Sequence, residues 1–218
     1  KIYRSGATGS ETCSADDNNC YSVASCNLSG CSGNSCDATC TINMQFHADP
    51  TDSGTYSSQY WRAWVEVTDS QSATGSAYSP IDLPEVNTLT SLDVTSSISY
   101  GSLMVSEDTG ITNQEVTVAN TGNAAIDFEL SGANMCTDYP TCSESVLAVG
   151  QQEYSLSGFT YGGGTALSAS PAQIEADLAK PTSSPSTSTD AVYWGVGIPE
   201  GSGAGGYSGE NIFSAVAD

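Results

Sequence analysis

The chain has very few cationic side chains. Its 218 residues contain 25 acidic and four basic side chains, which gives a formal net charge of −21 at pH 7. Because phosphate binding requires clustered lysine and arginine, this composition excludes a nucleic-acid-binding protein. It also argues against docking on an anionic membrane surface through a basic patch.

Long apolar runs are missing as well. No stretch of about 18 consecutive apolar residues occurs, so we expect no transmembrane helix and no membrane insertion by this chain. No basic and then apolar leader begins at Lys1, and no sorting tail ends at Asp218. The sequence is that of a mature chain or of a piece of a longer one, and both alternatives stay open.

Catalytic motifs are equally scarce. His47 is the single histidine, and neither a GxSxG elbow nor a phosphate-binding glycine loop before a helix is present. The 25 acids make some pair of neighbouring carboxylates inevitable, so a glycosidase pair cannot be singled out. We therefore expect a non-enzymatic protein that requires no cofactor, and rank a secreted enzyme third among the alternatives.

Eight cysteines set the compartment. Two of them are Cys136 and Cys142, and the other six lie within residues 13–40: Cys13, Cys20, Cys26, Cys31, Cys36 and Cys40. No CxxC pair occurs, so disulfides are favoured over a zinc site. We expect Cys136 to pair with Cys142 and the six to pair among themselves in an order that the spacing leaves open. Disulfides indicate an oxidising location, with the protein secreted or held at the cell surface.

The chain divides into three parts by composition. Residues 1–40 form a disulfide-rich Ser/Gly segment, with one glycosylation candidate at Asn27 in the sequon Asn-Leu-Ser. Residues 41–87 form a small β-region that is either separate or part of a first sandwich. Residues 88–218 contain the remaining strands and a Ser/Thr/Pro loop at 180–190.

Apolar residues alternate with polar ones along most of the chain, which predicts strands. In the β-region, strands are expected at 41–46 and 62–68, with a loop at 70–80 and an edge strand at 81–86. In the last part, two short strands are expected within 92–105, and further strands at 114–120, 125–132, 153–159, 165–170, 192–198 and 207–217. Val116 and Val118 are expected to share one face of 114–120. In 125–132, Ile126, Phe128 and Leu130 are expected to face inward, with Asp127 and Glu129 facing outward. Residues 171–178 are expected to be the only helix, starting at Pro171. Short strands separated by frequent turns favour an all-β sandwich.

Two sequence segments in the last part carry a family resemblance. EVTVANTGNAAIDFELSG and IPEGSGAGGYSGENIFSAVA resemble strand–turn–strand segments of the immunoglobulin-like modules, CARDB-like and NEW3-like, of bacterial and archaeal cell-surface proteins. The resemblance covers about residues 88–218. It implies an immunoglobulin-like antiparallel β-sandwich in an extracellular structural or adhesive module, and it carries over no catalytic residue.

Acidic residues at expected strand ends suggest a cation site. Asp49, Asp52 and Asp69 lie near the ends of the strands predicted in the β-region. Calcium takes several oxygen ligands, which loops rich in Asp, Asn and Ser supply. We predict calcium as the cation at these three aspartates, against the alternative that each is a solvated surface acid.

A group of aromatic residues suggests a second kind of site. Tyr60, Trp61 and Trp64 lie close together in the sequence, and such rings stack on sugars. Trp61 and Trp64 are three positions apart on an expected strand, so they face opposite sides and one of them belongs to the core.

These observations lead to two functional expectations. The first is a non-enzymatic, extracellular structural subunit of a cell-surface filament, layer or appendage that self-associates through sheet edges. The alternative is an adhesin module that binds a carbohydrate or a cell surface.

Overall fold

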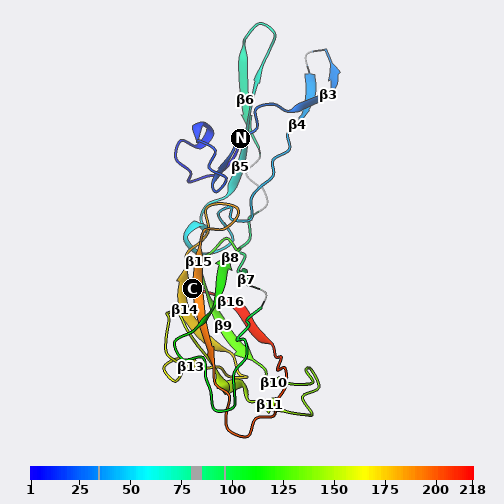
Figure 1. The fold of residues 1–218 in the computed structure, drawn as a ribbon. Helices are drawn as coiled ribbons and strands as arrows, with labels where there is room; N and C mark the ends of the chain where they lie inside the picture. The colour runs from blue at the N-terminus through cyan, green and yellow to red at the C-terminus, as the bar shows by residue number, and fades with distance from the viewer. Residues whose placement is uncertain (34, 80–84, 96) are drawn as a thin grey trace. The chain divides into compact units, whose positions relative to one another are not determined.

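A computed structural model describes residues 1–33, 35–79, 85–95 and 97–218 of the chain. Its sheets are antiparallel, and its only helices there are short 3₁₀ turns, so the all-β prediction is confirmed. The backbone forms two compact units (Figure 1). Unit 1 comprises Lys1–Leu89, Gly122–Ala124 and Pro181–Pro185, and unit 2 comprises Thr90–Thr121, Ala125–Lys180 and Ser186–Asp218. The expected boundary between 1–40 and 41–87 therefore falls inside unit 1.

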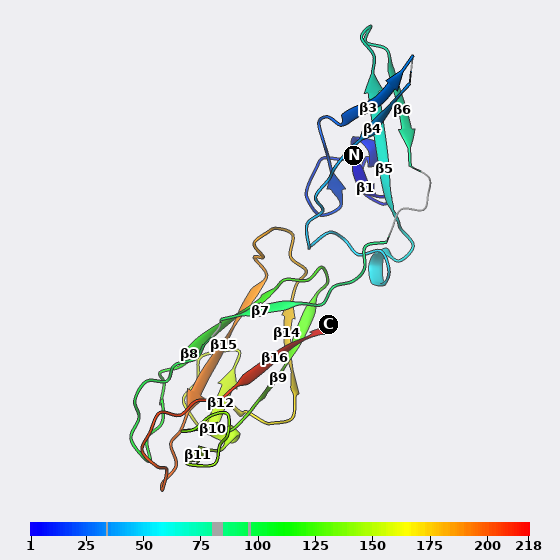
Figure 2. The same cartoon turned by 90° about the vertical axis from the view of Figure 1, so that its right-hand side faces the viewer.

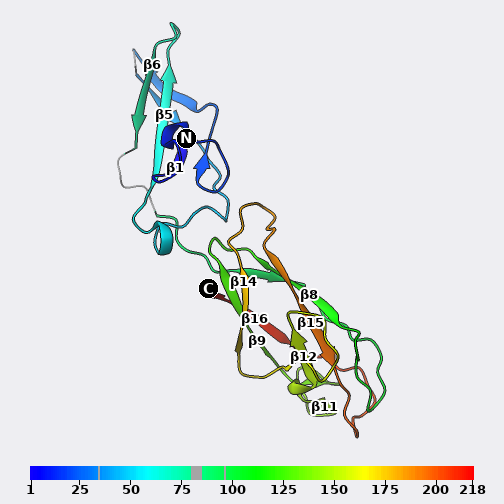
Figure 3. The ribbon, with the colours of Figure 1, turned by 90° about the vertical axis from the view of Figure 1, so that its left-hand side faces the viewer.

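Unit 1 is built on a sheet with the strand order β2-β1-β5-β6. Its strands are β1 (Ile2–Arg4), β2 (Cys20–Tyr21), β5 (Trp61–Thr68) and β6 (Thr74–Tyr78). β1 pairs with β2 on one side and with the first residues of β5 on the other. β5 and β6 continue past β1 as a two-stranded ribbon (Figure 3).

A separate hairpin in unit 1 is held by disulfides. It consists of β3 (Asn27–Ser32) and β4 (Ser35–Thr39), whose residues are all exposed. The bonds Cys26–Cys40 and Cys31–Cys36 close this hairpin, and Cys13–Cys20 ties a loop to β2. Each disulfide of this kind stabilises a fold by about 2–4 kcal/mol, mainly by restricting the unfolded chain. The six cysteines thus pair among themselves, as expected.

The apolar core of unit 1 is small. One cluster joins Tyr3, Ala7, Cys13 and Cys20 to Trp64, and a second joins Tyr21, Ala48 and Trp61 to Ile2, Ile42 and Val86. The 3₁₀ helices η1 (Ser10–Thr12) and η2 (Gly54–Tyr56) lie in the loops of this unit. Two clusters of this size leave much of the stabilisation of unit 1 to its disulfides and polar contacts.

Two expectations for unit 1 were wrong. Residues 41–46 form no strand, and Ile42 packs from a loop onto the cluster of Tyr21 and Trp61. The expected loop at 70–80 contains β6, because Asp69 accepts hydrogen bonds from the N–H groups of Gln71 and Ala73 (2.8 and 2.9 Å) and turns the chain back along β5. The edge strand expected at 81–86 lies mostly outside the described residues.

Unit 2 contains two sheets that pack across one core (Figure 2). The larger sheet has the order β13 (Thr165–Ala166), β12 (Gln152–Ser155), β15 (Thr189–Val196), β8 (Gln114–Asn120) and β7 (Leu92–Val94). The smaller sheet has the order β14 (Ala172–Leu178), β9 (Ile126–Gly132) and β16 (Asn211–Ala217). The short pair β10 (Met135–Cys136) and β11 (Val146–Leu147) and the 3₁₀ helix η3 (Val149–Gln151) complete the unit.

The core of unit 2 follows the alternation seen in the sequence. The fully buried side chains that meet between the two sheets are Val116, Val118, Val192 and Trp194 from the larger sheet and Ile126, Phe128 and Leu130 from the smaller one. Since successive residues of a strand point to opposite faces, the period-two pattern of β8 and β9 identified these inward positions correctly.

The helix expected at 171–178 is instead strand β14. The second short strand expected within 92–105 was also wrong, because β7 is the only strand among the described residues of that range. Ile174, Ala176 and Leu178 alternate toward the core, and the strand pairs with β9 through a register break between Ile174 and Leu178. Asp127 of β9, expected to face solvent, is 1% exposed and fills this break. Its carboxylate accepts hydrogen bonds from the N–H groups of Ala176 (2.9 Å) and Asp177 (3.0 Å).

These hydrogen bonds make the stability of unit 2 depend on pH. The N–H of Asp177 lowers the pKa of Asp127 most, burial opposes this, and the N–H of Ala176 lowers it further. A carboxyl group with a lower pKa in the folded than in the unfolded state stabilises the fold above its unfolded pKa of about 3.9, and this stabilisation is lost as the pH falls through the folded pKa.

We expect Asp127→Asn to lower the free energy of unfolding of unit 2 by about 1–2 kcal/mol at pH 7, because the buried N–H groups lose a charged acceptor. The difference from the wild type should shrink below about pH 4, where the wild-type carboxyl group also takes up its proton. Urea unfolding at both pH values measures this. If the difference in unfolding free energy between the two proteins stayed constant with pH, the charged form of Asp127 would not stabilise unit 2.

Candidate functional sites

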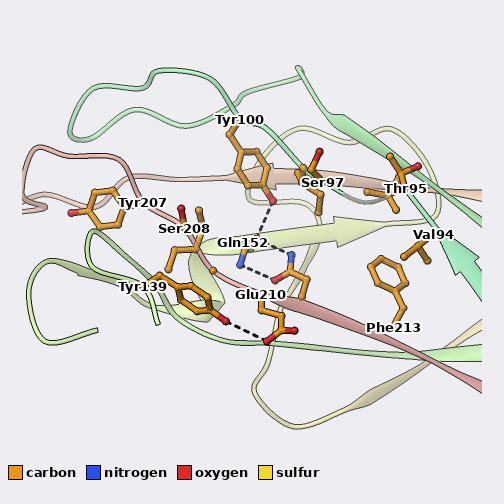
Figure 4. Close-up of a pocket in the computed structure, with 15 residues that line it drawn as sticks. Val94, Thr95, Ser97, Tyr100, Tyr139, Gln152, Tyr207, Ser208, Glu210 and Phe213 are labelled. Carbon is orange, nitrogen blue, oxygen red and sulfur yellow. Dashed lines mark hydrogen bonds between the residues drawn. The ribbon is translucent and has the colours of Figure 1, made fainter. Parts of the chain in front are cut away.

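A cleft opens in unit 2 where the loop after β7 faces β16 (Figure 4). Its volume is about 580 Å³, within the range typical of small-molecule sites. The polar side chains that distinguish it are Tyr100, Tyr139, Tyr207, Gln152, Asn211 and Glu210, and apolar residues such as Val94, Ile98 and Phe213 line the remainder. We call this feature the tyrosine cleft.

The floor of the tyrosine cleft is a fixed hydrogen-bond network. Gln152, the first residue of β12, is 3% exposed, and its Oε1 accepts hydrogen bonds from the Tyr100 hydroxyl (3.1 Å) and from Asn211 Nδ2 (3.0 Å). Gln152 Nε2 in turn donates to Asn211 Oδ1 (3.3 Å). Because each amide orients the other, donors and acceptors stand at fixed positions across the two sheets (Figure 4).

One wall of the cleft is held by the fourth disulfide. Cys136 and Cys142 are joined, as expected, and they close the loop that carries Tyr139. Cys136 also exchanges two backbone hydrogen bonds with Ser208 (2.9 and 3.0 Å), which fixes the loop beside the segment leading into β16. The Tyr139 hydroxyl donates to Glu210 Oε2 (3.2 Å). Gly209 allows β10 to lie close to the segment before β16, because a Cβ there would lie 2.9 Å from Met135 Cγ.

Burial and nearby charge determine the protonation state of the tyrosine hydroxyls in the cleft. Burial raises the pKa of Tyr100. Burial and the nearby Glu210 carboxylate raise the pKa of Tyr139. Both hydroxyls therefore stay protonated donors at neutral pH. Glu210 is the only charged residue among the described lining residues, so the cleft has no cation to bind an anionic group.

The second candidate site is the outer edge of β6 in unit 1. The N–H and C=O groups of Ala63, Val65 and Val67 on β5 point toward β6. The hydrogen bonds from Ser79 N to Ala63 O and from Asp69 N to Ala73 O show this register. Backbone groups of successive residues point to opposite sides of a strand. The N–H and C=O groups of Thr74, Ser76 and Tyr78 on β6 therefore point away from β5. All five residues of β6 are exposed. We call this row of backbone groups the open edge.

One face of the same ribbon is apolar. Val65 lies opposite Ala77, and Val67 lies opposite Gly75. Val67 is 56% exposed, and Val65 is exposed as well. The open edge is thus flanked by an uncharged surface against which a further strand can pack.

The aromatic residues predicted to bind sugar do not form a platform. Trp61 is 2% exposed, and its Nε1 donates to the carbonyl of Asp49 (3.1 Å), so it is a core residue and the prediction for it was wrong. Trp64 packs against the cluster around Tyr3, and Tyr60 is half-buried. The expectation that Trp61 and Trp64 face opposite sides agrees with their packing on different clusters.

The three predicted calcium ligands are engaged separately. Asp49 is buried in an ion pair with Arg4, and Asp69 accepts hydrogen bonds from the hairpin turn after β5. Asp52 accepts from the N–H (2.9 Å) and the hydroxyl (2.7 Å) of Thr88. No group of three or more potential metal ligands occurs within the described ranges. Calcium binding by this chain stays a prediction.

The remaining candidates have ordinary positions. His47 is 1% exposed and makes an edge-on ring contact with Phe46 at 5.0 Å between centroids. Asn27 lies exposed at the start of β3, where a glycan can be accommodated, and glycosylation stays a prediction. In the part of the chain that the structure describes, no helix is both long and apolar enough to span a membrane.

Sequence reasoning missed the tyrosine cleft. Tyr100, Tyr139 and Tyr207 come from three loops that are far apart in the chain, and no local pattern links them. Only Tyr139 carried a signal, because it lies within the short loop that Cys136 and Cys142 enclose. No protein-family model and no curated protein matches this sequence, so the sites rest on their geometry.

The Arg4–Asp49 pair is the polar centre of unit 1. Arg4 Nε lies 2.9 Å from Asp49 Oδ2, with both side chains almost fully buried. The guanidinium also donates to Gln59 Oε1 and stacks on the Tyr56 ring at 3.8 Å from its centroid. Asp49 in this structure neutralises a buried cation that connects β1 with the loop before β5.

We expect Asp49→Ala to destabilise unit 1 by about 3–5 kcal/mol, because it leaves the guanidinium of Arg4 buried without a counter-charge. Glu66→Ala on the exposed face of β5 is the matched control and should change stability by less than about 0.5 kcal/mol. Hydrogen exchange of the β1 and β5 amides reports the effect. Equal protection in the two variants would show that the pair is dispensable.

Proposed function

We propose that this chain is a non-enzymatic structural module of an extracellular cell-surface assembly, in which copies join by pairing at the open edge of β6. The observation that carries the proposal is a regular, uncharged edge strand with all five residues exposed. Unpaired N–H and C=O groups in such a row form a template for a strand of another molecule.

Most of the other outer strands of the described residues have features that oppose such pairing. β2, β7, β10, β11 and β13 contain only two or three residues. β14 and the β3–β4 hairpin have register breaks, and β14 also carries Glu175 and Asp177. β16 is an uncharged edge strand, but some of its residues contact β7 of the larger sheet. Natural proteins use short strands, charges and bulges to block edge pairing, and β6 has none of these.

The occupant that fits the open edge best is a second copy of β6. Two antiparallel copies of the segment Thr74–Tyr78 bring no like charges together, since the strand contains no charged residue. The apolar residues Val65, Val67 and Ala77 lie on one face of the ribbon and can be buried in the same contact. The net charge of −21 opposes association over longer distances.

The location and the family remain part of the proposal. Four disulfides indicate an oxidising environment, which supports a secreted or surface-held protein. The two packed sheets of unit 2 support the resemblance of residues 88–218 to CARDB-like and NEW3-like modules. The burial of the single histidine in unit 1 supports a role without catalysis.

We expect the wild-type chain to associate as its concentration rises, and more strongly in about 1 M salt, where the screening length falls to about 3 Å. Ser76→Pro should remain monomeric, because it removes an outward N–H group and leaves the bonds to β5 in place. Sedimentation velocity measures the mass of both proteins.

Ser76→Thr is the matched control, since it retains the N–H group and should associate like the wild type. Hydrogen exchange of the β5 amides checks that Ser76→Pro keeps the hairpin folded. A wild-type protein that stays monomeric at every concentration and salt level would overturn the proposal, and so would a Ser76→Pro variant that associates normally.

A further inference from the structure

The tyrosine cleft combines an apolar surface with groups that can form hydrogen bonds. Apolar side chains such as Val94, Ile98 and Phe213 lie beside tyrosine rings, amides and a carboxylate. A sugar ring has apolar C–H faces surrounded by hydroxyl groups, so it needs both surfaces within one small cleft. A purely apolar ligand would cover the Glu210 carboxylate without offering it a hydrogen bond, which is unfavourable.

The polar groups in the cleft are orientated before any ligand arrives. The mutual hydrogen bonds of Gln152 and Asn211, with the hydroxyl of Tyr100 on the same Oε1 atom, fix both amide planes. The disulfide-closed loop fixes Tyr139 beside Glu210. A ligand that meets orientated donors and acceptors loses less free energy to ordering the site.

Charge narrows the class of ligand further. Glu210 is the single charged lining residue that the structure describes, and a carboxylate has several acceptor positions of which Tyr139 occupies one. Two neighbouring hydroxyl groups of a sugar can donate to the positions that remain. Phosphorylated, sulfated or uronic ligands would be repelled by this carboxylate and by the net charge of −21.

We propose that the tyrosine cleft binds a neutral saccharide, with Glu210 accepting from sugar hydroxyls and Tyr139 and Tyr100 forming the walls that contact the ring. The site lies wholly in unit 2 and shares no residue with the open edge of β6 in unit 1. It replaces the grouping of Tyr60, Trp61 and Trp64 as the place where a surface glycan would bind.

The test is titration of the full ¹⁵N-labelled chain with cellobiose, maltose and N,N′-diacetylchitobiose at millimolar concentrations. At least one disaccharide should shift the side-chain amide signals of Gln152 and Asn211 in a saturable way. Glu210→Gln and Tyr139→Phe should each weaken binding by about tenfold, because each removes a hydrogen bond that involves a charged group. Glu115→Gln, an exposed carboxylate on β8, is the matched control and should bind normally.

Three results would overturn the proposal. The first is that none of the three disaccharides shifts these signals. The second is binding that Glu210→Gln and Tyr139→Phe leave unchanged, which would place the sugar elsewhere. The third is that choline shifts the signals and the sugars do not, which would make the cleft a cation site. Since Ser76→Pro leaves the cleft intact, saccharide binding by that variant separates this test from the test of assembly.

Discussion

Hydrogen bonds from backbone N–H groups to carboxylates fix several of the turns and loops on which this structure depends. With 25 acids and four bases, most carboxylates have no cation to pair with. The acids that accept from two or more backbone N–H groups are Asp16, Asp69, Asp127, Asp138 and Glu153. Such hydrogen bonds stabilise the negative charge of the carboxylate. They also fix the turn, because the N–H groups of several residues must point at the same carboxylate.

This arrangement connects the fold with the two proposed sites. Asp69 turns the chain between β5 and β6 and thereby creates the ribbon that carries the open edge. Asp138 accepts from the N–H groups of Ser143 and Glu144 and so holds the loop that carries Tyr139. The Cys136–Cys142 disulfide closes the same loop as Asp138, and two further disulfides close the β3–β4 hairpin. A small apolar core can stabilise the fold when the loops are fixed in this way. The acids at the turns are distributed over the chain and are not gathered around one cation.

The sequence predicted what depends on local alternation and missed what depends on distant partners. β8 and β9 were predicted with the correct inward faces, because Val116, Val118, Ile126 and Phe128 alternate and are buried. Residues 171–178 were predicted as a helix although Ile174, Ala176 and Leu178 alternate. The partner strand β9 and the bulge in β14 opposite Asp127 were not visible in the sequence. The tyrosine cleft was missed for the same reason, because β12 and β16 bring its amides together across 59 residues of sequence. Burial of Trp61 also follows from its packing on Tyr21, which no local pattern shows.

The most direct test of this account is a pH titration of the side-chain carboxyl groups by ¹³C NMR. Hydrogen bonds lower the pKa of Asp52, Asp127 and Asp138, and for Asp16 the bonds from Asn19, Asn18 and Cys20 outweigh the opposing effect of burial. We predict that these four carboxyls titrate below the ordinary value of about 3.9, and that they still do so in about 1 M salt, because hydrogen bonds at contact distance are not screened. If the four titrate at or above that value, carboxylates do not hold the turns of this protein, and the account is wrong.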